Sequence, residues 1–390
     1  MTGGHGGRPA GRRLARLDLH IGTAKTGTTS IQAWLRLNRA ALAERSVFTP
    51  ALPLDGNHWW LAAAFAPHER LEEFWLAQPA DDAAGRDLLS RRTLSTYADA
   101  ARGSGCARAV LSSEHLHDRL LTRDGIAALK AWVDALFDEV RVILVVRDPL
   151  ELMLSQKSTD LRGGEASLEV APPDSEDARR LCDHAASIRR WADVFGEEAL
   201  RVRRFAPGAS VEVFDAALGG VGAGLAPPPR ENESFSRLGA EVLARCNALW
   251  GVRGPQEMWS PRRGRLLRLI SGAFAEGPRL LPDRDAVLAY DAAFARSNEA
   301  VRARWFPERE RLFDRDPRHQ AALDGAAPPR LEVEDAALDM IAAALTRAAE
   351  ELAAQDKARR DLFEGPGGLA LRALRRARRL AARLGWSPGP

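Results

Sequence analysis

The segment His20-Ile21-Gly22-Thr23-Ala24-Lys25-Thr26-Gly27-Thr28-Thr29-Ser30 joins an apolar run to an amphipathic stretch that begins at Ile31. A strand-like run, a turn rich in glycine and a helical pattern are typical of a unit whose loop and helix N-terminus bind phosphate. The glycines have the spacing of the ATP-type loop G-x-x-x-x-G-K-[ST], but Thr28 stands at the lysine position and the lysine is Lys25, inside the loop. The displaced cation favours a nucleotide whose reactive group is not a γ-phosphate.

Lysine is rare in this chain, since only four of its 56 basic residues are lysine. The bias toward arginine, alanine and glycine is typical of a GC-rich bacterial genome. A lysine inside a Gly/Thr loop is therefore unexpected from composition, and Lys25 is a candidate functional residue. The alternative is an exposed lysine in an ordinary strand-to-helix turn.

A second candidate anion site follows the most strand-like segment. Residues 140–146 form an almost continuous β-branched run, typical of a strand buried on both faces of a parallel sheet, and the run ends at Arg147-Asp148-Pro149. Ser155 lies about two turns into the helix that follows, so Arg147 and Ser155 can flank an anion near its start. The planar fork of arginine suits phosphate. The alternative is an arginine paired with a carboxylate and a serine that caps locally.

Strand-like and helical segments alternate along the first half of the chain. Strands are expected at 17–21, 47–50, 107–111, 140–146 and 200–205. This order predicts an α/β fold of three layers, α/β/α, with a mostly parallel, P-loop-like central sheet and helical C-terminal additions at 238–252, 286–305 and 333–356. Ligands of such sheets bind beyond the carboxyl ends of the strands, where the two candidate sites fall.

Composition divides the chain into four parts: a disordered basic arm (1–16), the α/β domain (17–325), a helical segment (326–364) and a basic amphipathic tail (365–390). Removing the ten arginines of the two ends from the formal charge of +3 leaves −7 for residues 17–364. A mildly acidic body argues against a nucleic-acid-binding fold. The tail has an apolar stripe among its arginines at 369–386, which favours peripheral contact with an anionic membrane; a solvated helix is the alternative.

The cellular setting is predicted from what the chain lacks. Its three cysteines are far apart and form no C-x-x-C pair, so neither a disulfide framework nor a thiolate metal site is indicated. The first residues contain no apolar signal-peptide core, and no stretch has the length of a membrane span. We expect a cytoplasmic protein, with the inner face of the membrane as the place of any contact by the tail.

The two candidate sites together resemble the signature elements of the bacterial sulfotransferases that use 3′-phosphoadenosine-5′-phosphosulfate (PAPS). Lys25-Thr26-Gly27-Thr28-Thr29-Ser30 matches the first element position by position, and Arg147 and Ser155 match the second, including their spacing. Weaker matches are Asn232-Glu233-Ser234 and Trp305-Phe306-Pro307 with Leu312-Phe313, so the resemblance extends over about 17–315. It implies that the first element binds the 5′-phosphosulfate and the second the 3′-phosphate, without a metal.

The resemblance implies sulfuryl transfer from PAPS to a hydroxyl or amine, with a carbohydrate or glycoconjugate as the expected acceptor. Lys25 is the candidate for stabilising charge on the departing phosphate. The acceptor also needs a general base. Glu114, after the third expected strand, and His58, in a polar loop, are equal candidates; His115 follows and His117 is weaker. Trp59 and Trp60 are candidates for contact with a sugar ring or, alternatively, for the core.

Other functions remain open at this stage. Asp148 after an apolar strand also fits the carboxylate that holds Mg²⁺ in a P-loop kinase, although Thr28 and Arg147 argue against that function. A catalytically inactive nucleotide-binding protein would keep both anion sites. A nucleic-acid binder that uses the two basic ends would show salt-sensitive affinity. The acceptor atom and the oligomeric state are not predicted.

Overall fold

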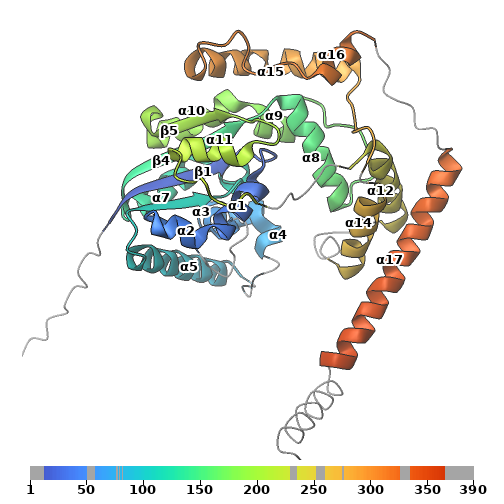
Figure 1. Cartoon of the computed structure of the whole chain (residues 1–390), viewed down its shortest axis with the longest axis horizontal. Helices are drawn as coiled ribbons and strands as arrows, with labels where there is room; N and C mark the ends of the chain where they lie inside the picture. The colour runs from blue at the N-terminus through green and yellow to red at the C-terminus, as the bar shows by residue number, and fades with distance from the viewer. Residues whose placement is uncertain are drawn as a thin grey trace, which may run out of the picture. The chain divides into compact units, whose positions relative to one another are not determined.

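The computed structural model of the chain describes residues 13–50, 58–75, 78, 80, 82–228, 235–251, 260–274, 276–325 and 334–364 (Figure 1). These residues form two compact units. The first unit takes its described residues from 13–156, 170–228 and 281–325, and the second from 157–169, 235–280 and 334–364. Within the described ranges, every helix is too short or too polar to cross a bilayer.

A five-stranded sheet is the centre of the first unit. Its strand order is β2-β3-β1-β4-β5 and every neighbouring pair is parallel. The strands are β1 (Leu14–Gly22), β2 (Val47–Phe48), β3 (Arg108–Ser112), β4 (Phe137–Val146) and β5 (Leu200–Arg204). Because all five are parallel, their carboxyl ends lie at one edge.

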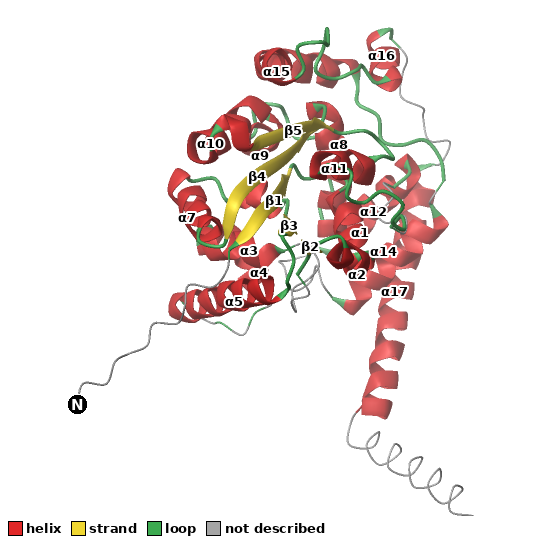
Figure 2. Ribbon diagram, turned by 60° about the vertical axis from the view of Figure 1, so that its left-hand side comes forward, coloured by secondary structure: helices red, strands yellow, loops and turns green. Residues whose placement is uncertain are grey.

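Helices cover both faces of this sheet. One face carries α3 (Trp59–Phe65), α5 (Ala83–Gly103), α7 (Arg123–Asp134) and α10 (His184–Phe195), and the other carries α1 (Thr28–Leu37), α2 (Arg39–Glu44) and α11 (Ser210–Leu218). Figure 2 shows α7 and α10 on one side of the yellow strands and α1 and α11 on the other. The predicted three-layer α/β/α class with a parallel sheet is confirmed.

The two faces follow from the alternation of side chains along each strand. Leu17, Leu19 and Ile21 of β1 are fully buried in the core beneath α7 and α10. Val110 of β3 and Ile143 of β4 belong to the core beneath α1 and α11 instead. Since both faces are covered, the central strands are apolar on both sides, which is why 140–146 is so strongly apolar in sequence.

Further helices complete the first unit. They are η1 (His68–Leu71), α4 (Glu72–Trp75), α6 (His115–Arg119), α9 (Glu176–Cys182), η2 (Glu197–Ala199), α15 (Arg284–Trp305) and α16 (Pro317–Leu323). The helix α8 (Pro149–Gly163) begins in the first unit and its last turns belong to the second. A separate core joins the start of α8 to α9, α15 and α16.

The second unit is helical. It contains α12 (Arg237–Trp250), α14 (Pro261–Ala273), α17 (Asp335–Glu364) and the end of α8. Arg263 of α14 is fully buried there and donates hydrogen bonds to the carbonyl oxygens of Leu161 and Arg162 and to Asn247 Oδ1. The last carbonyls of a helix attract a cation, so the C-terminus of α8 stabilises this buried guanidinium.

The structure divides the chain differently from the boundaries expected from composition. The strand β1 begins at Leu14 rather than Leu17, because Leu14 is buried and pairs with Phe137, so residues 14–16 of the expected arm are part of the sheet. Residues 157–169 and 235–280 lie inside the expected 17–325 domain, yet they belong with α17 to the second unit. A periodic apolar face does not reveal which helices share it. The sequence also did not predict α5 or α14.

Candidate functional site

The loop after β1 has the backbone of an anion-binding turn. Gly22, Lys25 and Gly27 all have positive φ, at 107°, 63° and 81°. Thr26 Oγ1 donates a hydrogen bond to the carbonyl oxygen of Thr23 (2.7 Å), and the N–H of Thr23 donates to the carbonyl oxygen of Val145 in β4 (3.0 Å). The loop is therefore held both to itself and to the neighbouring strand.

The helix α1 begins directly after this loop, at Thr28, with Gly27 as its left-handed N-cap. The first N–H groups of a helix have no intrahelical acceptor, and together with the helix dipole they attract an anion. Thr28 is buried, Ser30 is partly buried and Thr29 is exposed, so hydroxyl groups stand at the same helix end.

Two glycines of the loop are required by close neighbours as well as by φ. A Cβ at Gly27 would lie 2.1 Å from Ser210 Oγ, at the start of α11. A Cβ at Gly22 would lie 3.2 Å from Glu114 Cα. The loop is thus wedged between the segments that follow β3 and β5. Ser210 was not singled out from the sequence, where nothing distinguishes it from other helix-start serines.

The second motif touches the first. Arg147, directly after β4, donates from Nη1 to the carbonyl oxygen of Lys25 at 2.7 Å. Its guanidinium also lies 4.7 Å from the centre of the Phe205 ring, a cation–π contact, and its Nη2 lies 3.3 Å from Glu151 Oε2. Ser155 is partly buried in the second turn of α8. The two motifs therefore occupy one place at the carboxyl edge of the sheet.

Glu151 connects this arginine to a distant segment of the chain. Its Oε1 lies 3.0 Å from Arg318 Nη2 and 2.9 Å from His319 Nε2, both of α16. Burial alone would raise the pKa of Glu151, but the hydrogen bond from His319 and the charges of Arg318 and Arg147 lower it below its ordinary value. The sequence does not show this cluster, because α16 lies more than 160 residues further along.

Glu114 lies beside the loop. Its Oε2 accepts a hydrogen bond from Gln32 Nε2 of α1 at 2.8 Å. Burial raises the pKa of the Glu114 carboxyl, while hydrogen bonds from Gln32 and Thr28 and the charge of Lys25 act in the opposite direction. A carboxyl of raised pKa, held by an amide and close to a lysine, has the chemistry of a general base.

His58 is buried and its ring has one fixed role. Nδ1 accepts a hydrogen bond from the N–H of Ser112 at the end of β3 (3.0 Å). The neutral ring must then carry its proton on Nε2. Burial, aided by the charge of Arg39, lowers the pKa of His58 to about 4. In this geometry the Nε2–H of His58 can donate a hydrogen bond, and the ring has no vacant nitrogen with which to take a proton.

The other candidate histidines, His115 and His117, and the ring of Trp60 are largely enclosed by the fold. His117 Nε2 lies 3.0 Å from Ser187 Oγ, and burial lowers its pKa to about 3. Burial also lowers the pKa of His115 well below its ordinary value, and its ring packs against Trp59 with the ring centres 4.4 Å apart. Trp60 is buried in the core of the sheet, so its ring is not available to a sugar.

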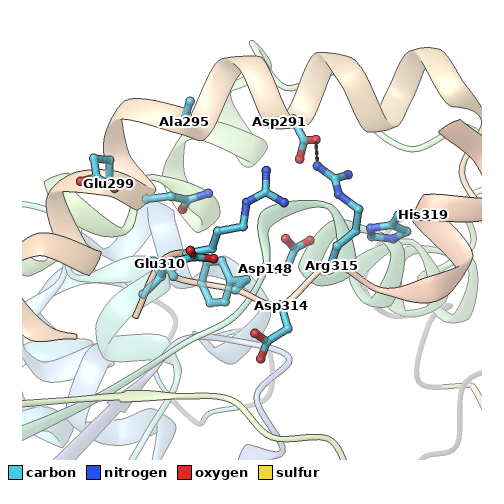
Figure 3. Close-up of a pocket in the computed structure, with 12 residues that line it drawn as sticks. Asp148, Asp291, Ala295, Glu299, Glu310, Asp314, Arg315 and His319 are labelled. Carbon is cyan, nitrogen blue, oxygen red and sulfur yellow. Dashed lines mark hydrogen bonds and ion pairs between the residues drawn. The ribbon is translucent and has the colours of Figure 1, made fainter. Parts of the chain in front are cut away.

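Asp148 has a local structural role. Its Oδ1 accepts the N–H of Glu151 at 3.0 Å, which caps the start of α8, and burial raises its pKa. It also lines a cavity of about 300 Å³ beneath α15 (Figure 3). The acidic residues there are partly neutralised, as by the ion pair of Asp291 with Arg315 at 2.6 Å. Among the residues that the structure describes, no group of three or more side chains has the arrangement of a metal site.

Some predicted features lie outside the described residues. They are Asn232-Glu233-Ser234, the basic tail at 365–390 and the first twelve residues of the expected arm. Of the second weak match, Trp305 ends α15 and Phe306 and Phe313 pack against the main core, while Leu312 is buried in it.

Comparison with known proteins finds little. No family model matches the chain, and none of the curated proteins matches it. Among solved structures, the crystal structure of a sulfotransferase from Alicyclobacillus acidocaldarius is similar at 18% identity and a TM-score of 0.34, over 62% of this chain and 97% of that chain.

Proposed function

We propose that this chain is a sulfotransferase that moves a sulfuryl group from PAPS to an acceptor hydroxyl or amine, with a carbohydrate or glycoconjugate as acceptor. The observation that supports it most is the hydrogen bond from Arg147 Nη1 to the carbonyl oxygen of Lys25. It joins a helix N-terminus with a lysine to an arginine at the next strand end. Two anion sites in contact fit one small molecule that carries phosphate groups on its ribose and on its tail.

The residues divide the binding as follows. The loop from Lys25 to Ser30 binds the 5′-phosphosulfate through its N–H and hydroxyl groups, and Arg147 with Ser155 binds the 3′-phosphate. Arg147 suits this role because Phe205 and Glu151 already hold its guanidinium in place. The co-substrate supplies the sulfuryl group and leaves as 3′-phosphoadenosine-5′-phosphate (PAP).

Glu114 is the better candidate for the general base. It accepts the proton of the acceptor as the acceptor oxygen or nitrogen bonds to sulfur and the bond from sulfur to the phosphate oxygen breaks. Lys25 stabilises the negative charge that grows on that phosphate oxygen. His58 is less suited, because the N–H of Ser112 already occupies Nδ1 and the proton resides on Nε2.

The binding preference can be measured by thermal unfolding with PAP, AMP, ADP and ATP. A ligand at about 100 times its dissociation constant stabilises by about 2.7 kcal/mol. We expect a large rise in melting temperature with PAP and little with AMP or ATP. Arg147→Ala should remove the preference, while Arg91→Ala, an exposed arginine of α5, should keep it.

The result that contradicts the proposal is an equal shift with ATP and PAP. Mg²⁺-dependent ATP turnover would favour a kinase. A PAP-specific shift without transfer of label from [³⁵S]PAPS to any saccharide would indicate a nucleotide-binding protein without catalytic activity.

A further inference from the structure

A small pocket lies beside the proposed base. Its polar lining consists of Gln32 and Arg36 of α1, Arg39, Thr49 and His58. Its volume is about 10 Å³, which is room for one water-sized group. Among the residues that the structure describes, no carboxylate lines it.

The polar atoms around this pocket suit an oxygen that carries negative charge. The tautomer of His58 set by Ser112 leaves Nε2–H as a donor. Thr49 is 4% exposed, and its buried Oγ1 has no hydrogen-bond partner among the described residues. A buried hydroxyl without a partner costs free energy, so a ligand that supplies one is favoured.

Two arginines give the pocket a positive potential. Arg39 Nη2 donates to the carbonyl oxygen of Pro50 at 2.8 Å, which fixes its guanidinium in the wall. The charge of Arg39 acts on the His58 ring, so the two groups are close. Arg36 is exposed to solvent and lines the same pocket. A guanidinium prefers carboxylate, sulfate or phosphate oxygens.

Gln32 connects the pocket to the proposed base. Gln32 lines the pocket and donates from Nε2 to Glu114 Oε2 at 2.8 Å and to the carbonyl oxygen of Ser112 at 3.3 Å. The N–H of Ser112 holds His58. The side chain of Gln32 therefore lies between the pocket and the carboxyl of Glu114.

We propose that this pocket binds one oxygen of an anionic group, a carboxylate or a sulfate ester, on the sulfuryl acceptor. The acceptor is then an acidic saccharide rather than a neutral one. The assignment of this anionic group to a sulfuryl acceptor rests on the proposed function. Whether the pocket binds an anion can be tested independently of that function. Arg36, Thr49 and His58 become specificity residues.

The first test uses simple anions. Protein labelled with ¹⁵N-histidine, both without and with PAP, is titrated with sodium acetate or sodium sulfate, against sodium chloride at equal ionic strength, while the His58 ring signals are followed. We expect a saturable shift with acetate or sulfate. Since removal of one charged hydrogen bond costs about 1.4 kcal/mol or more, Arg36→Gln should weaken binding about tenfold. Thr49→Val should weaken it in the same direction.

A matched control is Arg91→Gln, which removes the same charge from an exposed position of α5 and should leave the titration unchanged. If neither anion shifts His58 more than chloride does, the pocket holds water only and the inference is wrong. The same conclusion follows if the shift is identical in both pocket variants and the wild type.

The second test concerns the acceptor. Neutral oligosaccharides and their uronic-acid or sulfated counterparts are incubated with [³⁵S]PAPS. The wild type should label the acidic oligosaccharides in preference to the neutral ones. Arg36→Gln should lose most of this preference, while its thermal shift with PAP stays the same. Label confined to neutral members would overturn the acceptor class. If PAP does not raise the melting temperature, the proposed function is contradicted. The anion titration then decides by itself whether the pocket binds an anion.

Discussion

At the scale of single residues, the structure separates two candidates that the sequence left equal. Glu114 and His58 both follow strands at the same edge of the sheet. The ring of His58 is fixed by the N–H of Ser112, whereas the carboxyl of Glu114 accepts from a side chain, Gln32. A carboxylate retains lone pairs after such a bond, so it can still take a proton, and a neutral imidazole that already accepts at one nitrogen cannot.

The pKa of Glu114 predicts the acid limb of the pH profile. Burial raises this pKa. As the pH falls, Glu114 therefore becomes protonated, and stops acting as a base, at a higher pH than an ordinary carboxyl group does. The hydrogen bond from Gln32 lowers it. Gln32→Leu should therefore move the acid limb of kcat/KM to higher pH, as measured with [³⁵S]PAPS. A limb that moves to lower pH would argue against Glu114 as the base.

Lys25 should matter for rate more than for binding. Removing a donor that stabilises charge in the transition state typically lowers the rate by about 10²–10³. Lys25→Ala should lower kcat to this extent while the thermal shift with PAP falls only modestly. Lys130→Ala, in α7 and away from the site, is the matched control. Equal loss of PAP binding and kcat would assign Lys25 to binding alone.

At the scale of elements, α16 acts on the site through α8. Arg318 and His319 of α16 contact the carboxylate of Glu151 in α8, and this carboxylate also pairs with Arg147. Arg318 therefore shares the negative charge of Glu151 that would otherwise act on Arg147 alone. A short helix far along the chain thus tunes the arginine expected to hold the 3′-phosphate.

Arg318→Gln should weaken PAP binding without removing it. With Arg318 neutral, Glu151 pairs more strongly with Arg147 and competes with the phosphate. Because the Arg318 side chain is 42% exposed, solvent screens the effect, and we expect roughly a threefold to tenfold rise in the dissociation constant for PAP. Isothermal titration measures it. Arg315→Gln, whose partner is Asp291, should have less effect, and a tighter PAP complex in Arg318→Gln would contradict the linkage.

At the scale of the whole molecule, buried histidines make stability depend on pH. Burial lowers the pKa of His20 and His117 to about 3 and that of His58 and His184 to about 4. Each is neutral in the folded chain, while the unfolded chain takes up a proton below about pH 6.5. Their contribution is present above pH 6.5 and is lost as the pH falls toward the folded values.

Acidification from pH 7 to pH 4.5 should therefore lower the melting temperature. Each such histidine contributes a slope of at most about 1.4 kcal/mol per pH unit below pH 6.5, and the raised pKa values of Glu114 and Asp148 offset part of the sum. His117→Gln should lower the slope of the free energy of unfolding against pH by up to the amount that corresponds to one bound proton. Urea unfolding at a series of pH values measures it, and a slope unchanged in this variant would show that His117 does not titrate differently in the two states.

The order of elements could be read from the chain because local patterns encode it. The apolar run at 140–146 and the Gly/Thr loop after β1 can each be recognised from a few consecutive residues. All five strands were therefore expected within about three residues of their observed limits. The two motifs at Lys25 and Arg147 were found for the same reason. Their roles in binding and catalysis stay predictions.

Amino-acid sequence by itself determined the three-layer class, the loop and the arginine at the next strand end, because periodicity, glycine spacing and residue type are local. Only the tertiary structure decided that Arg147 donates a hydrogen bond to the carbonyl oxygen of Lys25 and that the N–H of Ser112 donates to His58 Nδ1. It also decided that Glu151 contacts two residues of α16 and that residues 157–169 and 235–280 form one unit with α17. Each of these depends on contacts between residues far apart in the chain. Burial then sets the pKa of each group by removing water, and no local pattern records how much water is removed.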